Sequence, residues 1–144
     1  MLTLYRSRAW RRERPAILAE GSLPKNVAWI NLLKPEPDEV AFVKRTTGLD
    51  VPSIEDLSEI ESSSRLSSQS GAIYLSAPLI NRADSDQPLT TAVGFVLTRE
   101  RLITVRFEAL SSFNTFANRD LVAESNPLSS AAVFAGLMDA IADQ

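Results

Sequence analysis

Segments whose hydrophobic residues follow a strand pattern alternate along this chain with segments that follow a helical pattern. Each change from one pattern to the other marks a predicted element. Residues 27–33 form a short apolar run of strand-favouring residues closed by Pro35, which predicts a buried strand. Residues 37–47 then have proline in the first turn, acidic residues at the start, basic residues at the end and Gly48 after them. This pattern predicts a helix. Its apolar stripe, at i, i+3 and i+7, is Val40, Val43 and Thr47.

The second half of the chain contains three β-rich runs, at residues 71–80, 90–98 and 101–107. Arg99 and Glu100 join the last two runs, which predicts a tight hairpin without the usual glycine. We expect residues 81–88 to be a polar loop, and "SSSRLSS" (62–68) to be another, between helix and strand.

Two amphipathic helices are expected at the carboxyl end. Residues 107–120 place Leu110, Phe113 and Ala117 at helical spacing. The next helix is capped by Ser129 or Ser130. Its apolar face consists of Val133, Phe134, Leu137, Met138 and Ile141. No stop signal follows that face, so we expect the helix to continue in a longer polypeptide.

The amino end is less regular. Residues 2–18 read as strand-like segments, with apolar residues available for a core: Leu2, Leu4, Trp10 and Ile17. Ser53 and Asp56 match the capping-box signature, which predicts a short helix that begins near Ser53. The order of strands, helices, a strand meander and more helices predicts an α/β fold.

Composition narrows the chemistry. A length of 144 residues with 44% hydrophobic residues suits a single domain, residues 1–144, around one core. Cysteine and histidine are both absent, so disulfides, thiol nucleophiles and imidazole ligands are excluded, and any metal must be held by oxygen. No catalytic set can be assembled without histidine, and we expect no enzyme activity.

Charge argues against nucleic acid as a partner. The net charge is −3, although "YRSRAWRRER" (5–14) combines five arginines with two aromatic residues. We interpret this stretch as a solvated strand face. No apolar window of about 18 residues occurs, so the chain itself is expected to be soluble and cytosolic.

An acidic stretch at residues 49–65 carries five carboxylates, with no Lys or Arg between Arg45 and Arg65. These acids are Asp50, Glu55, Asp56, Glu59 and Glu61. Glu55 and Asp56 lie in the first turn of a helix, where the dipole favours negative charge. The rest can form a solvated acidic face, on which the repulsion between like charges costs little free energy. The alternative is a site for a hard divalent cation, since Mg²⁺ typically uses one or two carboxylates and retained waters.

The series "AWINLLKPEPDEVAFVKRTTGLDVPSIEDLSEIESSSRL", "GAIYLSAPLI", "VGFVLTRERLITVRF" and "SSFNTF" resembles the amino-terminal cytoplasmic domain of the CorA-type magnesium and cobalt transporters. The resemblance extends from about residue 28 to 143. It implies a three-layer α/β/α sandwich with a mixed sheet, in the intracellular funnel of a homopentamer. The stalk and the membrane helices that follow in this family are absent from this chain.

The resemblance also implies a regulatory cation site between neighbouring domains. Its residues would be Asp56, Glu55 and Asp139, in that order, with Glu59 as the substitute, because the acid pattern is shifted in one branch of the family. The ion would be Mg²⁺, both regulatory and transported, with Co²⁺, Ni²⁺ and Zn²⁺ left open. One departure is Asn31, which stands where the family often has aspartate.

The resulting hypothesis is a cytosolic regulatory domain of a divalent-cation channel in the cell membrane, which senses the ion through carboxylates between subunits. The alternative is a stand-alone α/β protein-interaction module with an acidic face. An oxygen-liganded metal hydrolase is a distant third reading.

Overall fold

The computed structural model describes residues 1–6, 12–13, 23, 26–58, 65–69, 71–81, 89–117 and 129–142. Predictions for Trp10, Ile17, Glu59, Glu61 and residues 82–88 lie outside these residues. In chain order the elements are β1 (Leu2–Arg6), β2 (Arg12–Glu13), β3 (Val27–Leu33), α1 (Pro37–Thr47), α2 (Ile54–Ser58), β4 (Arg65–Gln69), β5 (Ala72–Asn81), β6 (Leu89–Leu97), β7 (Leu102–Arg106), α3 (Ser111–Thr115) and α5 (Ser130–Ala142).

The strands of the described residues form one seven-stranded sheet in the order β2-β1-β3-β7-β6-β5-β4. β3 and β7 pair in parallel, with Trp29 opposite Leu102 and Asn31 opposite Thr104. The other neighbouring pairs are antiparallel, and β5 to β7 form the predicted meander, to which β4 adds a fourth strand. β7 is buried along its whole length, and β3 at every residue but its last. Burial on both faces explains why these strands read as continuous apolar runs.

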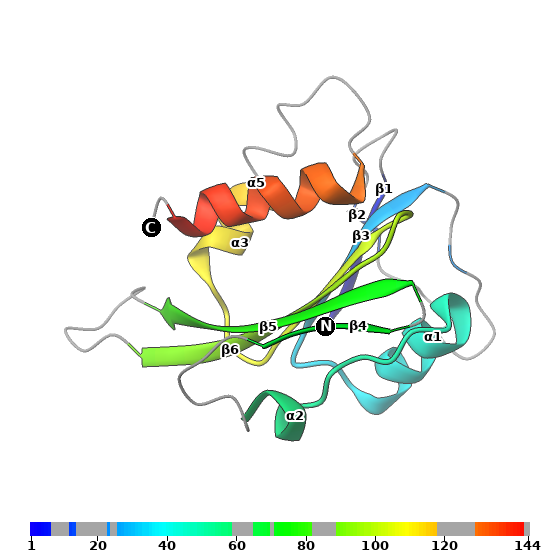
Figure 1. The fold of residues 1–144 in the computed structure, drawn as a ribbon, viewed down its shortest axis with the longest axis horizontal. Helices are drawn as coiled ribbons and strands as arrows, with labels where there is room; N and C mark the ends of the chain where they lie inside the picture. The colour runs from blue at the N-terminus through cyan, green and yellow to red at the C-terminus, as the bar shows by residue number, and fades with distance from the viewer. Residues whose placement is uncertain are drawn as a thin grey trace.

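Helices cover both faces of the sheet, with α1 and α2 on one side and α3 and α5 on the other (Figure 1). The predicted three-layer α/β/α sandwich with a mixed sheet is confirmed. The sequence predicted one core, and this was wrong, because the sheet separates two clusters. Leu57 and Val105 belong to the cluster under α1 and α2, and Trp29, Phe113 and Leu137 belong to the cluster under α3 and α5.

Helix α1 begins and ends as predicted. Pro37 is its first residue, and Gly48 follows it with a φ of 74°, a left-handed conformation that glycine adopts without steric cost. Phe42 and Val43 are its buried residues, whereas the other two members of the predicted stripe are half-buried. The helix therefore turns a slightly different face to the sheet than the stripe indicated.

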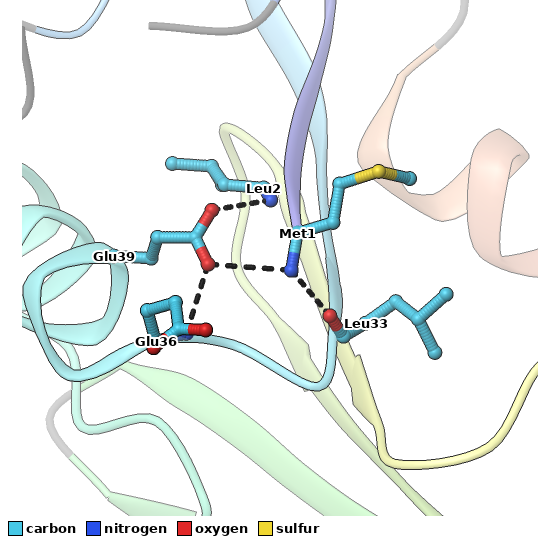
Figure 2. Close-up of polar contacts among 5 residues, drawn as sticks. All are labelled: Met1, Leu2, Leu33, Glu36 and Glu39. Atoms are coloured by element: carbon cyan, nitrogen blue, oxygen red, sulfur yellow. Dashed lines mark hydrogen bonds and ion pairs between the residues drawn. The ribbon is translucent and has the colours of Figure 1, made fainter.

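A single carboxylate joins α1 to the first strand. Glu39 accepts hydrogen bonds from the backbone N–H groups of Leu2 (2.7 Å) and Glu36 (2.8 Å), and its Oε1 lies 3.2 Å from the terminal ammonium of Met1 (Figure 2). The same ammonium donates to the carbonyl of Leu33, at the end of β3. The Glu39 side chain thus accepts a hydrogen bond from a backbone N–H at the start of α1 and also holds β1 beside β3.

These contacts lower the pKa of Glu39. Burial acts first and raises it, but the bonds from Glu36 and Leu2 and the positive charge of the terminal ammonium outweigh burial. The side chain is only 13% exposed, so solvent screens these interactions weakly. The charged carboxylate is therefore the form that the folded state stabilises.

Side chains close the predicted hairpin and attach the last helix to it. The backbone N–H of Thr98 donates to the carbonyl of Arg101 (3.0 Å), and the N–H of Arg101 donates to Thr98 Oγ1 (3.1 Å). Thr98 thus supplies the turn contacts in the absence of glycine. The hydroxyl of Ser130 donates to the carbonyl of Thr98 (2.5 Å), and Ser129 Oγ accepts from the N–H of Ala132 (3.1 Å), which identifies Ser129 as the cap of α5.

The prediction of a loop at residues 62–68 was wrong for its second half, because residues 65–69 form β4. This strand lacks the apolar alternation of a half-buried strand, since residues 66–69 are all exposed. Its order comes from backbone pairing with β5, from Arg65 opposite Ser76 to Gln69 opposite Ala72. Pairing of this kind leaves no hydrophobic pattern in the sequence.

The helix predicted at residues 107–120 is shorter than expected. α3 covers five residues, and a wider turn follows at residues 116–117. The predicted apolar positions Leu110, Phe113 and Ala117 are nevertheless all buried. Phe116 packs against the edge of Trp29 at 5.5 Å between ring centroids, and it lies beside Gly136 of α5.

We expect Gly136→Ala to destabilise the protein, although alanine normally favours a helix interior by about 1 kcal/mol over glycine. A Cβ at this position would lie 2.4 Å from Cε1 of Phe116, whose ring is buried. Overpacking typically costs about 1–3 kcal/mol, so a net loss of about 1 kcal/mol should appear in urea unfolding. Ala131→Gly, at an exposed position of the same helix, measures the propensity effect alone. A more stable Gly136→Ala variant would contradict this packing.

We expect Glu39→Gln to lower the free energy of unfolding at neutral pH by about 2 kcal/mol, the scale of hydrogen bonds to a charged group. Because folding lowers the pKa of Glu39, its contribution is present above pH 4.5, the ordinary value, and is lost as pH falls through the folded value. The difference between wild type and variant should therefore shrink below about pH 4.5. Chemical unfolding from pH 3 to 7 measures it, with exposed Glu100→Gln as the control. A difference independent of pH would contradict the assignment.

Candidate functional site

Helix α2 presents two of the predicted site carboxylates. The capping box forms as predicted, since the N–H of Ser53 donates to Asp56 Oδ2 (2.9 Å) and the N–H of Asp56 donates to Ser53 Oγ (3.1 Å). Glu55 and Asp56 are both exposed, while Leu57 is buried in the cluster beneath. Asp56 thus caps the helix start through Oδ2, and the carboxylate itself stays exposed.

A glycine in β6 sets how closely α2 approaches the sheet. A Cβ on Gly94 would lie 3.0 Å from Cγ1 of Val105, 3.2 Å from Cγ of Pro52 and 3.4 Å from Cδ2 of Leu57. The segment that carries the two acids therefore packs directly over this bare backbone position. Sheet geometry, through Gly94, positions the carboxylates.

The acidic stretch is less uniform than its sequence suggested. Asp50 forms an ion pair with Lys44 of α1, which raises the pKa of the lysine, first through the hydrogen bond and then through the charge. Asp50 is therefore neutralised by its own chain. Within the described residues, Glu55 and Asp56 have no ion pair with a basic side chain. A site at this surface would rest on these two acids.

Asp139 is exposed on α5, and α5 covers the opposite face of the sheet from α2 (Figure 1). The structure therefore does not bring Asp139 together with Glu55 and Asp56 within one chain. Among the described residues, no group of three metal-ligating side chains occurs. Two adjacent carboxylates still suit Mg²⁺, which keeps several waters and often takes only one or two protein carboxylates.

Sequence reasoning missed a buried charge at the end of β7. Arg106 is 3% exposed, and its guanidinium lies 4.4 Å from the ring centroid of Phe113. Burial lowers the pKa of Arg106 to about 10, with the nearby Tyr5 acting in the opposite direction. Its Nε and Nη1 atoms have no hydrogen-bond acceptor among the described residues. The run "LITVR" gives no signal for this, since an arginine at the end of a strand is ordinarily exposed.

The departure at Asn31 also has a structural context. The indole N–H of Trp29 donates to Thr104 Oγ1 (2.9 Å), whose hydroxyl donates to Asn31 Oδ1 (3.1 Å). All three side chains, on the neighbouring strands β3 and β7, are buried, and Trp29 belongs to the cluster under α3 and α5. Asn31 therefore acts as an acceptor inside the domain, far from the exposed acids of α2 on the other face.

The three-layer sandwich of this chain is also found in proteins of known structure. The soluble domain of CorA from Methanocaldococcus jannaschii superimposes with a TM-score of 0.70 and 10% sequence identity. The match covers 99% of this chain and 56% of the CorA chain. The ZntB cytoplasmic domain from Vibrio parahaemolyticus superimposes with a TM-score of 0.68 and 14% sequence identity. The match covers 98% of this chain and 57% of the ZntB chain. At such identities the likeness shows the fold.

Sequence comparison identifies the family. A family profile described as CorA-like Mg²⁺ transporter protein matches residues 24–144. The magnesium transport protein CorA of Wolinella succinogenes is 31% identical over 105 residues, which cover 70% of this chain and 33% of that protein. The chain belongs to the CorA-like Mg²⁺ transporter family, and the resemblance seen in its sequence is confirmed.

Membership places the chain in a family of magnesium transporters, a class distinct from enzymes. The chain spans about a third of the length of the curated relatives it matches. In the part of the chain that the structure describes, no helix is long and apolar enough to cross a membrane.

We expect Gly94→Val to displace the acid-bearing segment. Its branched side chain would collide with Pro52 and Leu57, at a cost of about 1–3 kcal/mol. Hydrogen exchange should quicken at the N–H of Leu57, which donates to the carbonyl of Ser53 in the wild type. Gly94→Ala, whose Cβ needs shifts of only a few tenths of an ångström, is the matched control and should have a smaller effect. Equal exchange in all three proteins would show that Gly94 does not position α2.

Proposed function

We propose that this chain is the cytosolic regulatory domain of a divalent-cation channel of the CorA-like family. Mg²⁺, the ion in the family's description, is proposed as both the transported and the sensed ion, with Co²⁺, Ni²⁺ and Zn²⁺ as alternatives. The observation that carries the proposal is the placement of Glu55 and Asp56 on one face of the sandwich and of Asp139 on the other.

This placement favours a site between copies. Acids on opposite faces of one domain cannot share an ion, but a head-to-tail contact places the α2 face of one copy against the α5 face of the next. Contacts of this kind close into rings when the rotation permits. A ring of five, as the family resemblance implies, would repeat the same carboxylate contact at every interface.

The proposed mechanism is electrostatic. Carboxylates that face each other at about 4 Å repel by roughly 1–4 kcal/mol, between the dielectric of water and that of a protein surface. A bridging cation converts that repulsion into attraction, so high cytosolic Mg²⁺ would hold neighbouring copies together. Loss of the ion would let them separate. Summed over a ring, such differences suffice to bias a two-state equilibrium between closed and open pores.

The test is paramagnetic mapping with Mn²⁺, an oxygen-preferring substitute for Mg²⁺. We expect amide signals near Glu55, Asp56 and Asp139 to broaden at the lowest Mn²⁺ concentration, and excess Mg²⁺ to restore them. The variant Glu55→Gln/Asp56→Asn should lose the effect at α2, because Asn keeps an oxygen for the cap but not the charge.

Asp38→Asn, at an exposed acid of α1, is the matched control and should leave the broadening unchanged. Equal broadening at every exposed carboxylate, or no reversal by Mg²⁺, would reject the cation site. Such a result would favour the alternative function, an interaction module that uses the same acidic face.

A further inference from the structure

The two edges of the sheet differ in how well they are protected against pairing with another strand. β2, at one edge, is two residues long and consists of Arg12 and Glu13. Short and charged edge strands are the usual protection. β4, at the other edge, has five residues and, after its first residue Arg65, no charge and no proline. Within the described residues, no strand or helix pairs with its outer side.

β4 is also open on both faces. Residues 66–69 are all exposed, so neither helical layer extends over this end of the sheet. Leu66 is 72% exposed and Ile73 of β5 is 46% exposed. The register places Leu66 opposite Leu75 and Ser68 opposite Ile73, so both exposed apolar residues lie on the face that α3 and α5 cover farther along the sheet. An apolar strip therefore occurs at an edge whose backbone groups pair with no further strand among the described residues.

We propose that β4 is a self-association edge, at which two copies of this chain pair antiparallel, β4 against β4, about a two-fold axis at Ser67. The strand fits itself in this register. Arg65 lies opposite the neutral Gln69 of the second copy, Leu66 opposite Ser68, and Ser67 opposite Ser67. No like charges face each other, which antiparallel pairing requires.

The same register brings the exposed apolar residues of the two copies close together. Leu66 of one copy lies diagonal to Leu66 of the other on the same face, at the roughly 7–8 Å that long side chains span. The strips of the two copies then join into one surface between their α5 layers. This contact uses neither Glu55 and Asp56 nor Asp139, so it stands apart from the proposed cation site.

The absence of cysteine makes the register directly testable, since a substituted cysteine is the protein's only thiol. In the proposed pairing the Cα atoms of the two Ser67 residues lie about 4.5–5.5 Å apart, within disulfide range. Those of the two Gln69 residues are offset by four positions, or about 13 Å, beyond that range. Under mild oxidation, Ser67→Cys should form a covalent dimer at least about tenfold faster than Gln69→Cys.

Sedimentation of the wild-type chain over a range of concentrations should show a reversible dimer. The buffer contains no divalent cation, so that the proposed head-to-tail contact, which a cation bridges, does not form. Leu66→Lys, which adds the charge that protected edges carry, should weaken this dimer about tenfold or more. Glu100→Gln, an equal change in net charge at the exposed hairpin turn, should leave it unchanged. Leu66 is largely exposed, so the lysine variant is expected to fold. A monomer at all concentrations, larger open oligomers, or equal crosslinking at residues 67 and 69 would each overturn the proposal.

Discussion

The parallel pairing of β3 with β7 is the constraint on which the rest of the structure depends. It joins residues 27–33 to residues 102–106, which are separated in sequence by α1, α2 and three strands. Parallel neighbours need a crossover that passes over a face of the sheet, and here the crossover contains α1 and α2. The chain then leaves β7 for α3 and α5 on the other face. One strand pair therefore decides which helices lie on which side.

The same arrangement separates the candidate carboxylates. α2 follows β3 on one face, and α5 follows β7 on the other, so Asp56 and Asp139 are directed away from each other by topology. A domain built in this way has different charged surfaces on its two helical layers. Head-to-tail assembly is the arrangement in which such surfaces meet, and the proposed cation site depends on it.

Charged groups inside the domain serve a different purpose from those on its surface. Glu39 accepts hydrogen bonds from two backbone N–H groups and pairs with the terminal ammonium, and these contacts link α1 to β1. Arg106 lies against Phe113 under α3, with part of its guanidinium lacking an acceptor in the described residues. Glu55 and Asp56 remain in solvent, where an external cation has access to them.

The sequence by itself determined the elements whose cause is local. Val27–Leu33 reads as a buried strand because burial on both faces requires continuous apolar residues, and Pro37 and Gly48 mark the helix between them through their own backbone preferences. Ser53 and Asp56 likewise predict a cap that depends on four consecutive residues. The tertiary structure alone decided what rests on contacts between elements: the order of β4, which pairing with β5 supplies, the burial of Arg106 under α3, the pairing of Asp50 with Lys44, and the placement of Asp56 and Asp139 on opposite faces. Some of these contacts join residues close in the chain, such as Lys44 and Asp50, which are six positions apart. All of them depend on how the helices and strands pack together, and this packing leaves no periodic pattern in the residues that make the contacts.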